Sequence, residues 1–374
     1  MSQALGFAEN ILTELESLNP ENYPGQKVTQ PGFLASLLTN QTRPNMIESQ
    51  GYVNGHRVPQ VNISYMRRST PAQWQTNIDC GIDASPAFRE TSQTINQVAS
   101  INLFFAEDTI RQYGQESSRI VNSNQTGVPM MSHIAKSIFT QLQGGYRKIN
   151  STLLTSMSTK IGKNVRGGLT TTAINFNDDG TTNSFAENIG RLATDLELNE
   201  ICGPTWMIGS GNPHVFFKQH GFRALSANQS GLNNAAIVDG LGAKFMYDPD
   251  AATVLGANRL LVAAENSVHF LEYNKHVGAF AGEKGAIVDF QIVDPFMQCW
   301  NNGAMTPFRW DVTLRYNDCD TSYAGYAGTA TYGKGWHVII SKTYDLFVTP
   351  TDAYDGGDII AGQNGTLLYE ITNT

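Results

Sequence analysis

Between Ser132 and Gly162 the chain carries one long amphipathic pattern, and this pattern constrains the fold more than any other feature. Apolar side chains recur there at intervals of three or four residues, which is the spacing of one helix face. They are Ile134, Ile138, Leu142, Tyr146, Ile149, Leu153, Met157 and Ile161. A helix of this length spans about 45 Å and needs a long apolar surface to cover it. We expect that surface to be a sheet of C-terminal strands that includes Val312, Leu314 and Val338.

Two segments with strand-like alternation precede the helix. In VPQVNISYM the side chains of Val61, Ile63 and Tyr65 alternate with polar ones. In QWQTNIDCGI the alternating set is Trp74, Thr76, Ile78, Cys80 and Ile82. The polar segment Arg67–Ala72 separates them and contains a proline. This arrangement predicts a β-hairpin. Asn54 and Gly55, just before it, predict a tight turn.

An isolated two-stranded hairpin is barely stable in water, so this one needs a surface to lie on. We expect that surface to be a neighbouring copy of the chain. Arg67 and Arg68 would then touch acidic or carbonyl groups of the neighbour, while Trp74 and Ile78 pack on its surface. The alternative for each arginine is full solvation, because exposed ion pairs contribute only about 0–1 kcal/mol.

The remaining chain alternates strands and helices and then becomes strand-rich. Ser184–Glu187 is a capping box that predicts the start of a helix. With the strands around it this pattern is typical of a compact α/β unit. The INLFFAEDTI segment near residue 105 fits either a strand or a helix. The predicted strands are Pro204–Ile208, Lys244–Tyr247, Arg259–Ala264, Val268–Tyr273, Ile287–Phe296, Pro307–Tyr316, Trp336–Ser341 and Leu346–Thr349.

Composition excludes several classes of protein. The formal net charge of −8 argues against a sequence-reading nucleic-acid binder, which carries a basic footprint. Charged residues make up 16% of the chain, below the usual ~25%, while Gly reaches 35 residues. The N-terminal segment lacks the basic region of a signal peptide, and no window resembles a membrane span. Four cysteines without a CxxC pattern indicate neither a disulfide framework nor a zinc site.

Candidate chemical motifs are weak. The GSGNPH segment Gly209–His214 sits where a phosphate loop would lie, but His214 replaces the third glycine of the dinucleotide fingerprint. Asn175–Gly180 resembles half a calcium loop, yet Ala186 stands where a bidentate Glu is needed. A second acidic segment, Asp352–Asp358, fits a solvated turn. We therefore expect no catalytic residues, no cofactor and no metal site, and we predict that the protein is not an enzyme.

Taken in order, these segments resemble a tailed-bacteriophage major capsid protein of the Hong Kong 97 fold. The phrases SIFTQLQGGYRKINSTLLTSM, PTWMIGSGNPHVFFKQ and LGAKFMYDPD are similar to capsid phrases of that family. The resemblance implies an α+β fold with an arm, an extended E-loop hairpin, a peripheral domain with a long spine helix, and an α/β axial domain. The implied boundaries are 1–49 for the arm, 50–84 for the hairpin, 85–166 for the peripheral domain, 167–285 for the axial domain, and 286–374 for the return strands.

The resemblance also implies a function and partners. The chain would self-assemble through pentamers and hexamers into an icosahedral shell around double-stranded DNA, which it contacts non-specifically. Its further partners would be a separate scaffolding protein, a portal and decoration proteins, with no membrane involved. The shell would assemble in the host bacterial cytoplasm and become part of the virion. Two alternatives remain: an encapsulin-like cellular compartment, and an α/β enzyme with an unrecognised site.

Overall fold

A computed structural model divides the chain into two compact units, each built from segments far apart in the sequence. Unit 1 comprises Met1–Thr29, Asn96–Lys148 and Glu272–Tyr344; unit 2 comprises Gln30–Ile95, Ile149–Leu271 and Asp345–Thr374. Helices combine with antiparallel and mixed sheets, so the expected α+β class is confirmed. The division into five segments, from the arm to the return strands, stays a prediction. The residues that the structure describes are 9–15, 32–39, 46–53, 56–66, 88–106, 121–122, 125–126, 130–175, 184–201, 205–213, 215, 243–264, 267–276, 280–284, 287–294, 308–317, 321–324, 329–332, 334–351 and 362–372.

Unit 1 is built on an antiparallel sheet. Its strands follow the order β12 (Phe280–Lys284), β13 (Ile287–Val293), β14 (Arg309–Asn317), β17 (Gly335–Val348) and β11 (Val268–Tyr273), and β4 (Gln97–Ala106) also pairs with β17. Residues 101–106 of the segment that fitted either a strand or a helix belong to strand β4, which pairs with β17 from Gln97 to Ala106; residues 107–110 lie outside the described part of the chain. The two predicted strands at Trp336–Ser341 and Leu346–Thr349 form the single strand β17. The sequence pattern did not reveal that the two strands are continuous, because Lys342 and Asp345 lie between them. Both side chains are buried, but they interrupt the apolar pattern.

The long helix forms as expected and covers one face of that sheet. Helix α4 spans Met130–Ser158, so it begins two residues before Ser132 and ends before Ile161. In unit 1 its side chains Ile134, Ile138, Leu142 and Tyr146 are buried. The Tyr146 ring lies 6.0 Å from that of Trp310. Trp310, Val312 and Leu314 alternate along β14 and share a face, so the helix packs on β14, one of the strands predicted for it.

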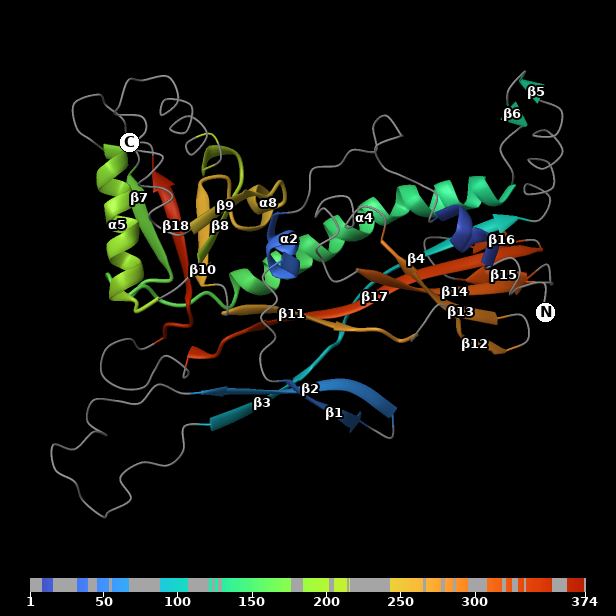
Figure 1. Ribbon diagram of the computed structural model, residues 1–374, viewed down its shortest axis with the longest axis horizontal. Coiled ribbons are helices and arrows are strands. Elements are labelled where there is room, and N and C mark those ends of the chain that lie inside the picture. Colours follow the sequence, from blue (N-terminus) through green and yellow to red (C-terminus); the bar gives the residue numbers. More distant parts are fainter. Residues whose placement is uncertain are drawn as a thin grey trace, which may run out of the picture. The chain divides into compact units, whose positions relative to one another are not determined.

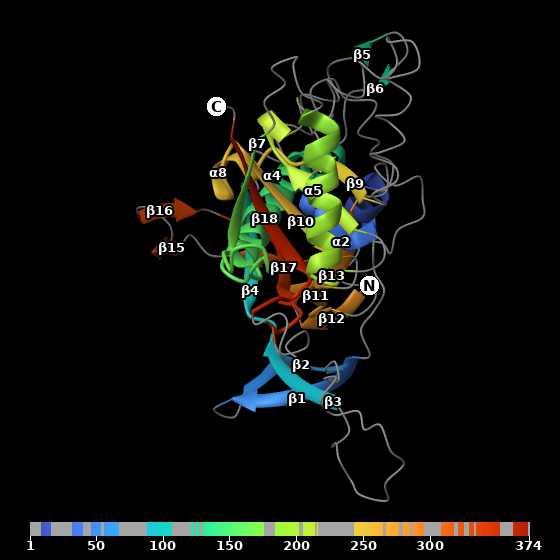
Figure 2. The ribbon, with the colours of Figure 1, turned by 90° about the vertical axis from the view of Figure 1, so that its left-hand side faces the viewer.

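Unit 2 contains a five-stranded mixed sheet covered by a helix. The strand order is β7 (Thr171–Asn175), β18 (Thr366–Thr372), β10 (Arg259–Ala264), β8 (Thr205–Gly209) and β9 (Ala243–Tyr247). Strands β18 and β7 pair in parallel, as do β8 and β9. Helix α5 (Ser184–Leu198) begins at the predicted capping residue and runs along this sheet (Figure 2). Its Leu192 and Leu196 share one core with Met207, Val262 and Tyr369.

A separate three-stranded antiparallel sheet also belongs to unit 2 (Figure 1). Strand β2 (His56–Met66) lies between β1 (Met46–Val53) and β3 (Phe88–Thr94). Val53 is paired with His56, so the connection consists of the two residues that predict a tight turn. The expected pairing of β2 with the segment containing Trp74 is wrong, because β1 and β3 occupy both edges of β2. Alternation shows that a segment is extended, but it does not identify the partner strand.

The remaining elements are short. Helix α2 spans Gly32–Thr39 in unit 2. No helix among the described residues is long and apolar enough to cross a membrane. The others are α8 (Ala251–Val254), β5 (Val121–Asn122), β6 (Gln125–Thr126), β15 (Thr321–Ala324) and β16 (Thr329–Tyr332).

Candidate functional site

The residues expected to form an intersubunit contact, Arg67, Arg68, Trp74 and Ile78, lie outside the described part of the chain. Their contacts therefore stay a prediction. All four cysteines and most of both acidic segments also lie outside it. Within the described ranges, no three His, Cys, Asp or Glu side chains gather as metal ligands would.

The GSGNPH segment is tied to a neighbouring turn. The Ser210 hydroxyl donates a hydrogen bond to the carbonyl oxygen of Ala257 at 3.2 Å. The Asn212 side-chain amide donates to the side-chain oxygen of Asn258. A Cβ added at Gly209 would lie 2.7 Å from the Pro213 side chain, so glycine allows a close approach there. These contacts hold the segment in place, so its role is that of a structural turn.

Helix α2 is anchored by a buried polar cluster. The Asp248 carboxylate accepts a hydrogen bond from the Phe33 backbone amide at 2.7 Å and from the Asn150 side-chain amide at 3.0 Å. The Asn150 side-chain oxygen accepts one from the Leu34 amide at 3.0 Å. Asp248 and Asn150 thus supply hydrogen-bond acceptors for the Phe33 and Leu34 amides at the start of α2, which have no partner within the helix. Burial raises the pKa of the Asp248 carboxyl above its ordinary value, although these hydrogen bonds oppose the rise.

A second cluster fastens α4 to its sheet. Asp294 is fully buried and accepts hydrogen bonds from the Tyr146 hydroxyl and from the Trp310 indole nitrogen, both at 2.5 Å. A Cβ added at Gly145 would lie 2.5 Å from the Trp310 ring. A glycine is therefore what lets the helix approach the indole this closely.

A third cluster joins three elements of unit 2. The Asp195 carboxylate on α5 accepts hydrogen bonds from the Tyr369 hydroxyl on β18 at 3.1 Å and from the Asn164 amide, beyond α4, at 3.2 Å. The Arg166 guanidinium lies 3.0 Å from the same carboxylate. Burial, with the nearby Asp195 charge, raises the pKa of the Tyr369 hydroxyl above its ordinary value. A phenol that stays protonated is a permanent hydrogen-bond donor.

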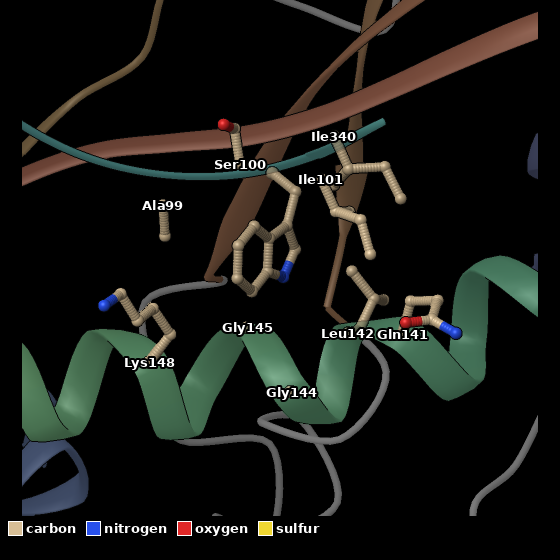
Figure 3. Close-up of a pocket in the computed structure, with 10 residues that line it drawn as sticks. Ala99, Ser100, Ile101, Gln141, Leu142, Gly144, Gly145, Lys148 and Ile340 are labelled. Atoms are coloured by element: carbon tan, nitrogen blue, oxygen red, sulfur yellow. The ribbon is translucent and has the colours of Figure 1, made fainter. Parts of the chain in front are cut away.

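A cavity of about 220 Å³ opens beside α4 in unit 1 (Figure 3). Ile101 and Ile340 reach toward it from β4 and β17, and Leu142, Gly144 and Gly145 line it from the helix. Lys148 is the one ionisable side chain among its lining residues. Acid–base or nucleophilic catalysis needs several polar groups converging on one point, and this cavity does not supply them.

The described clusters therefore hold elements in place. Sequence reasoning missed all three, because each depends on partners far apart along the chain. Phe33 and Asp248, for example, are 215 positions apart. The available signal was the presence of isolated acidic residues, Asp195, Asp248 and Asp294, beside apolar segments.

No family model and no curated protein matches the chain. Several solved structures do. The chain is similar to a structure from Mycobacterium phage Adephagia, with 11% identity, a TM-score of 0.44, and 93% of this chain and 92% of that chain covered. It is similar to the capsid structure of the cyanophage P-SCSP1u, with 11% identity, a TM-score of 0.42, and 94% and 92% covered. It is also similar to a virus-like particle from Pyrococcus furiosus, with 8% identity, a TM-score of 0.39, and 99% and 100% covered.

Proposed function

We propose that the chain is the major capsid protein of a tailed bacteriophage, with the Hong Kong 97 fold, and that it builds an icosahedral shell from pentamers and hexamers. The observation that carries the proposal is the order of elements. A separate sheet (β1–β3) precedes a long helix (α4) that packs on an antiparallel sheet, and a helix-covered mixed sheet follows. The E-loop, spine helix and axial domain would correspond to these three parts.

The separate sheet supports a role in assembly. In the described part of the chain, β1 and β3 are its outer strands, each paired on one side with β2. Outer strands present unpaired N–H and C=O groups that can bind another chain. The segment from Arg67 to Ile82 follows directly after β2. In a shell this region would lie on an adjacent subunit, with Arg67, Arg68, Trp74 and Ile78 in the contact.

The remaining parts of the proposal concern partners and location. A net charge of −8 suits a container wall, because it limits adhesion to packed phosphates and opposes uncontrolled association. Contacts to double-stranded DNA would be non-specific. Scaffolding, portal and decoration proteins would be separate chains. The subunit would assemble in the bacterial cytoplasm, end in the virion, and act as a structural protein rather than an enzyme.

Electron microscopy of the purified chain tests this function directly. We expect closed shells, or rings of five and six subunits, in negative stain. A strictly monomeric species by light scattering, at high concentration and across several salt and pH conditions, would contradict the proposal. Nuclease-protected DNA in shells from the native source supports the phage function, whereas an enclosed enzyme supports a cellular compartment.

A further inference from the structure

One side of α4 leaves a space unfilled beside the sheet of unit 1. The helix residues that line the cavity there are Gln141, Leu142, Gly144, Gly145 and Lys148. All of them except Leu142 are spaced i, i+3, i+4 and i+7, which places them on one side of the helix. The two central positions of that side are glycines, so the helix fills no space there. The cavity of about 220 Å³ lies where ordinary side chains would pack.

Gly144 has no packing reason to be a glycine. A Cβ added at Gly145 would lie 2.5 Å from the Trp310 ring, so the close approach to the indole explains that glycine. A Cβ added at Gly144 would meet no atom of the described chain within 4 Å. Glycine inside a helix lowers its stability relative to alanine. A residue that breaks a local folding rule without a gain in packing marks a candidate functional position, and Gly144 keeps the cavity open.

The cavity is apolar inside and polar at its mouth. Its buried lining residues are Ala99, Leu142, Trp310 and Ile340. Gln141 and Lys148 are exposed, so they lie at the mouth. In Figure 3 the Ala99 side chain points toward the helix at the end where Lys148 lies, and Gln141 lies at the other end. A ligand that fits this arrangement has an apolar body and a negative charge at one end.

We propose that this cavity binds a small apolar carboxylate, with its hydrocarbon part against Trp310 and its charge beside Lys148. An apolar cavity of ~150 Å³ binds benzene, so one of about 220 Å³ holds about nine carbon atoms. Decanoate and naphthoate both have an apolar part of about this size. An ammonium group has three donors, so Lys148 can hold a carboxylate in addition to its contacts within the chain. The cavity lies entirely within unit 1, so binding does not depend on shell assembly.

Isothermal titration calorimetry of the full-length chain with decanoate and with naphthoate tests the site. We expect saturable binding of one molecule per chain. Tighter binding of naphthoate would identify an aromatic ligand, and tighter binding of decanoate an aliphatic one. The absence of saturable binding for both compounds would overturn the proposal, whether or not shells form.

A variant that fills the cavity tests its location. We expect Gly144→Leu to weaken binding by more than about tenfold, because the apolar part of the ligand loses its buried contacts. Its circular dichroism should stay native, since leucine favours the helix and the added Cβ enters open space. Gly190→Leu on α5 is the matched control, because Gly190 is also exposed and its added Cβ also meets no described atom within 4 Å. Equal binding by Gly144→Leu and the parent chain would overturn the proposal.

The charge of the ligand is tested at Lys148. Because Lys148 is exposed, we expect Lys148→Gln to weaken naphthoate binding by about three- to fivefold. Binding of the neutral compound naphthalenemethanol should stay unchanged. Arg147→Gln is the matched control and should change neither affinity, because Arg147 is exposed and is not one of the described lining residues. Equal losses for the acid and the alcohol would overturn the assignment of a carboxylate, and this test also decides the proposal should Gly144→Leu not fold.

Discussion

Gly144 and Gly145 are adjacent on α4, and their surroundings predict opposite effects of the same substitution. A Cβ at Gly145 would lie 2.5 Å from Trp310, whose indole is held by Asp294 and cannot easily move. A Cβ at Gly144 meets nothing within 4 Å. We expect Gly145→Ala to lower the free energy of unfolding by about 1–3 kcal/mol through overpacking.

Gly144→Ala is the internal control, because alanine favours the helix and fits the open space. It should raise the free energy of unfolding by about 0.5–1 kcal/mol. Urea titration of both variants measures the difference. Equal effects at the two positions would show that α4 does not approach Trp310 as described.

Asp248 predicts a pH dependence with a defined sign. Its carboxyl has a pKa raised by burial above its ordinary value of 3.8, so the folded chain holds this proton at a higher pH than the unfolded chain does. The stability contributed by this group is therefore present below about pH 3.8 and is lost as pH rises through the folded pKa.

Asn keeps the size of this side chain but cannot ionise. We expect the free-energy difference between Asp248→Asn and the parent chain to shift in favour of the variant as pH rises from about 3.8. Urea unfolding over a pH series measures this shift. A difference that stays constant, or that moves the other way, would contradict the raised pKa.

At the scale of elements, α4 is the part of the fold that the sequence predicts best. Its apolar side chains recur at helical spacing and contact an apolar sheet, so local pattern and tertiary packing agree. We expect Leu153→Ala, at a fully buried position, to cost about 2–5 kcal/mol through cavity formation. Thr155→Ala, at an exposed position two residues further along the helix, should change stability by less than about 0.5 kcal/mol. Thermal and urea unfolding of the two variants measure whether the buried face of the helix contributes this much to the free energy of unfolding.

Other elements were beyond sequence reasoning for identifiable reasons. Strands β8, β9 and β10 follow from apolar runs, but β18 was not predicted, and its neighbours β7 and β10 come from distant segments. The two-residue connection between β1 and β2 makes them partners, and the alternation of side chains within β2 does not reveal this pairing. The acidic anchors of α2 and α4 were invisible, because a buried carboxylate and a solvated one look alike in a sequence.

At the scale of the whole molecule, the prediction concerns the intersubunit contacts of Arg67 and Arg68. We expect replacement of Arg67–Ala72 by a Gly/Ser linker of equal length to leave circular dichroism and the melting temperature unchanged and to reduce the yield of closed shells strongly. The same replacement at Asp352–Gly357, which the sequence assigns to a solvated turn, is the matched control. Normal shells from the first variant would show that this segment is not an intersubunit element.

The position of β18 has a consequence for synthesis. This strand lies inside the five-stranded sheet, between β7 and β10, although the ribosome makes it after both of them. The sheet therefore cannot close until translation has passed Thr372, and a chain released earlier leaves two strands without their shared neighbour. The folding of this sheet is thus coupled to the synthesis of β18, the last of its strands along the chain.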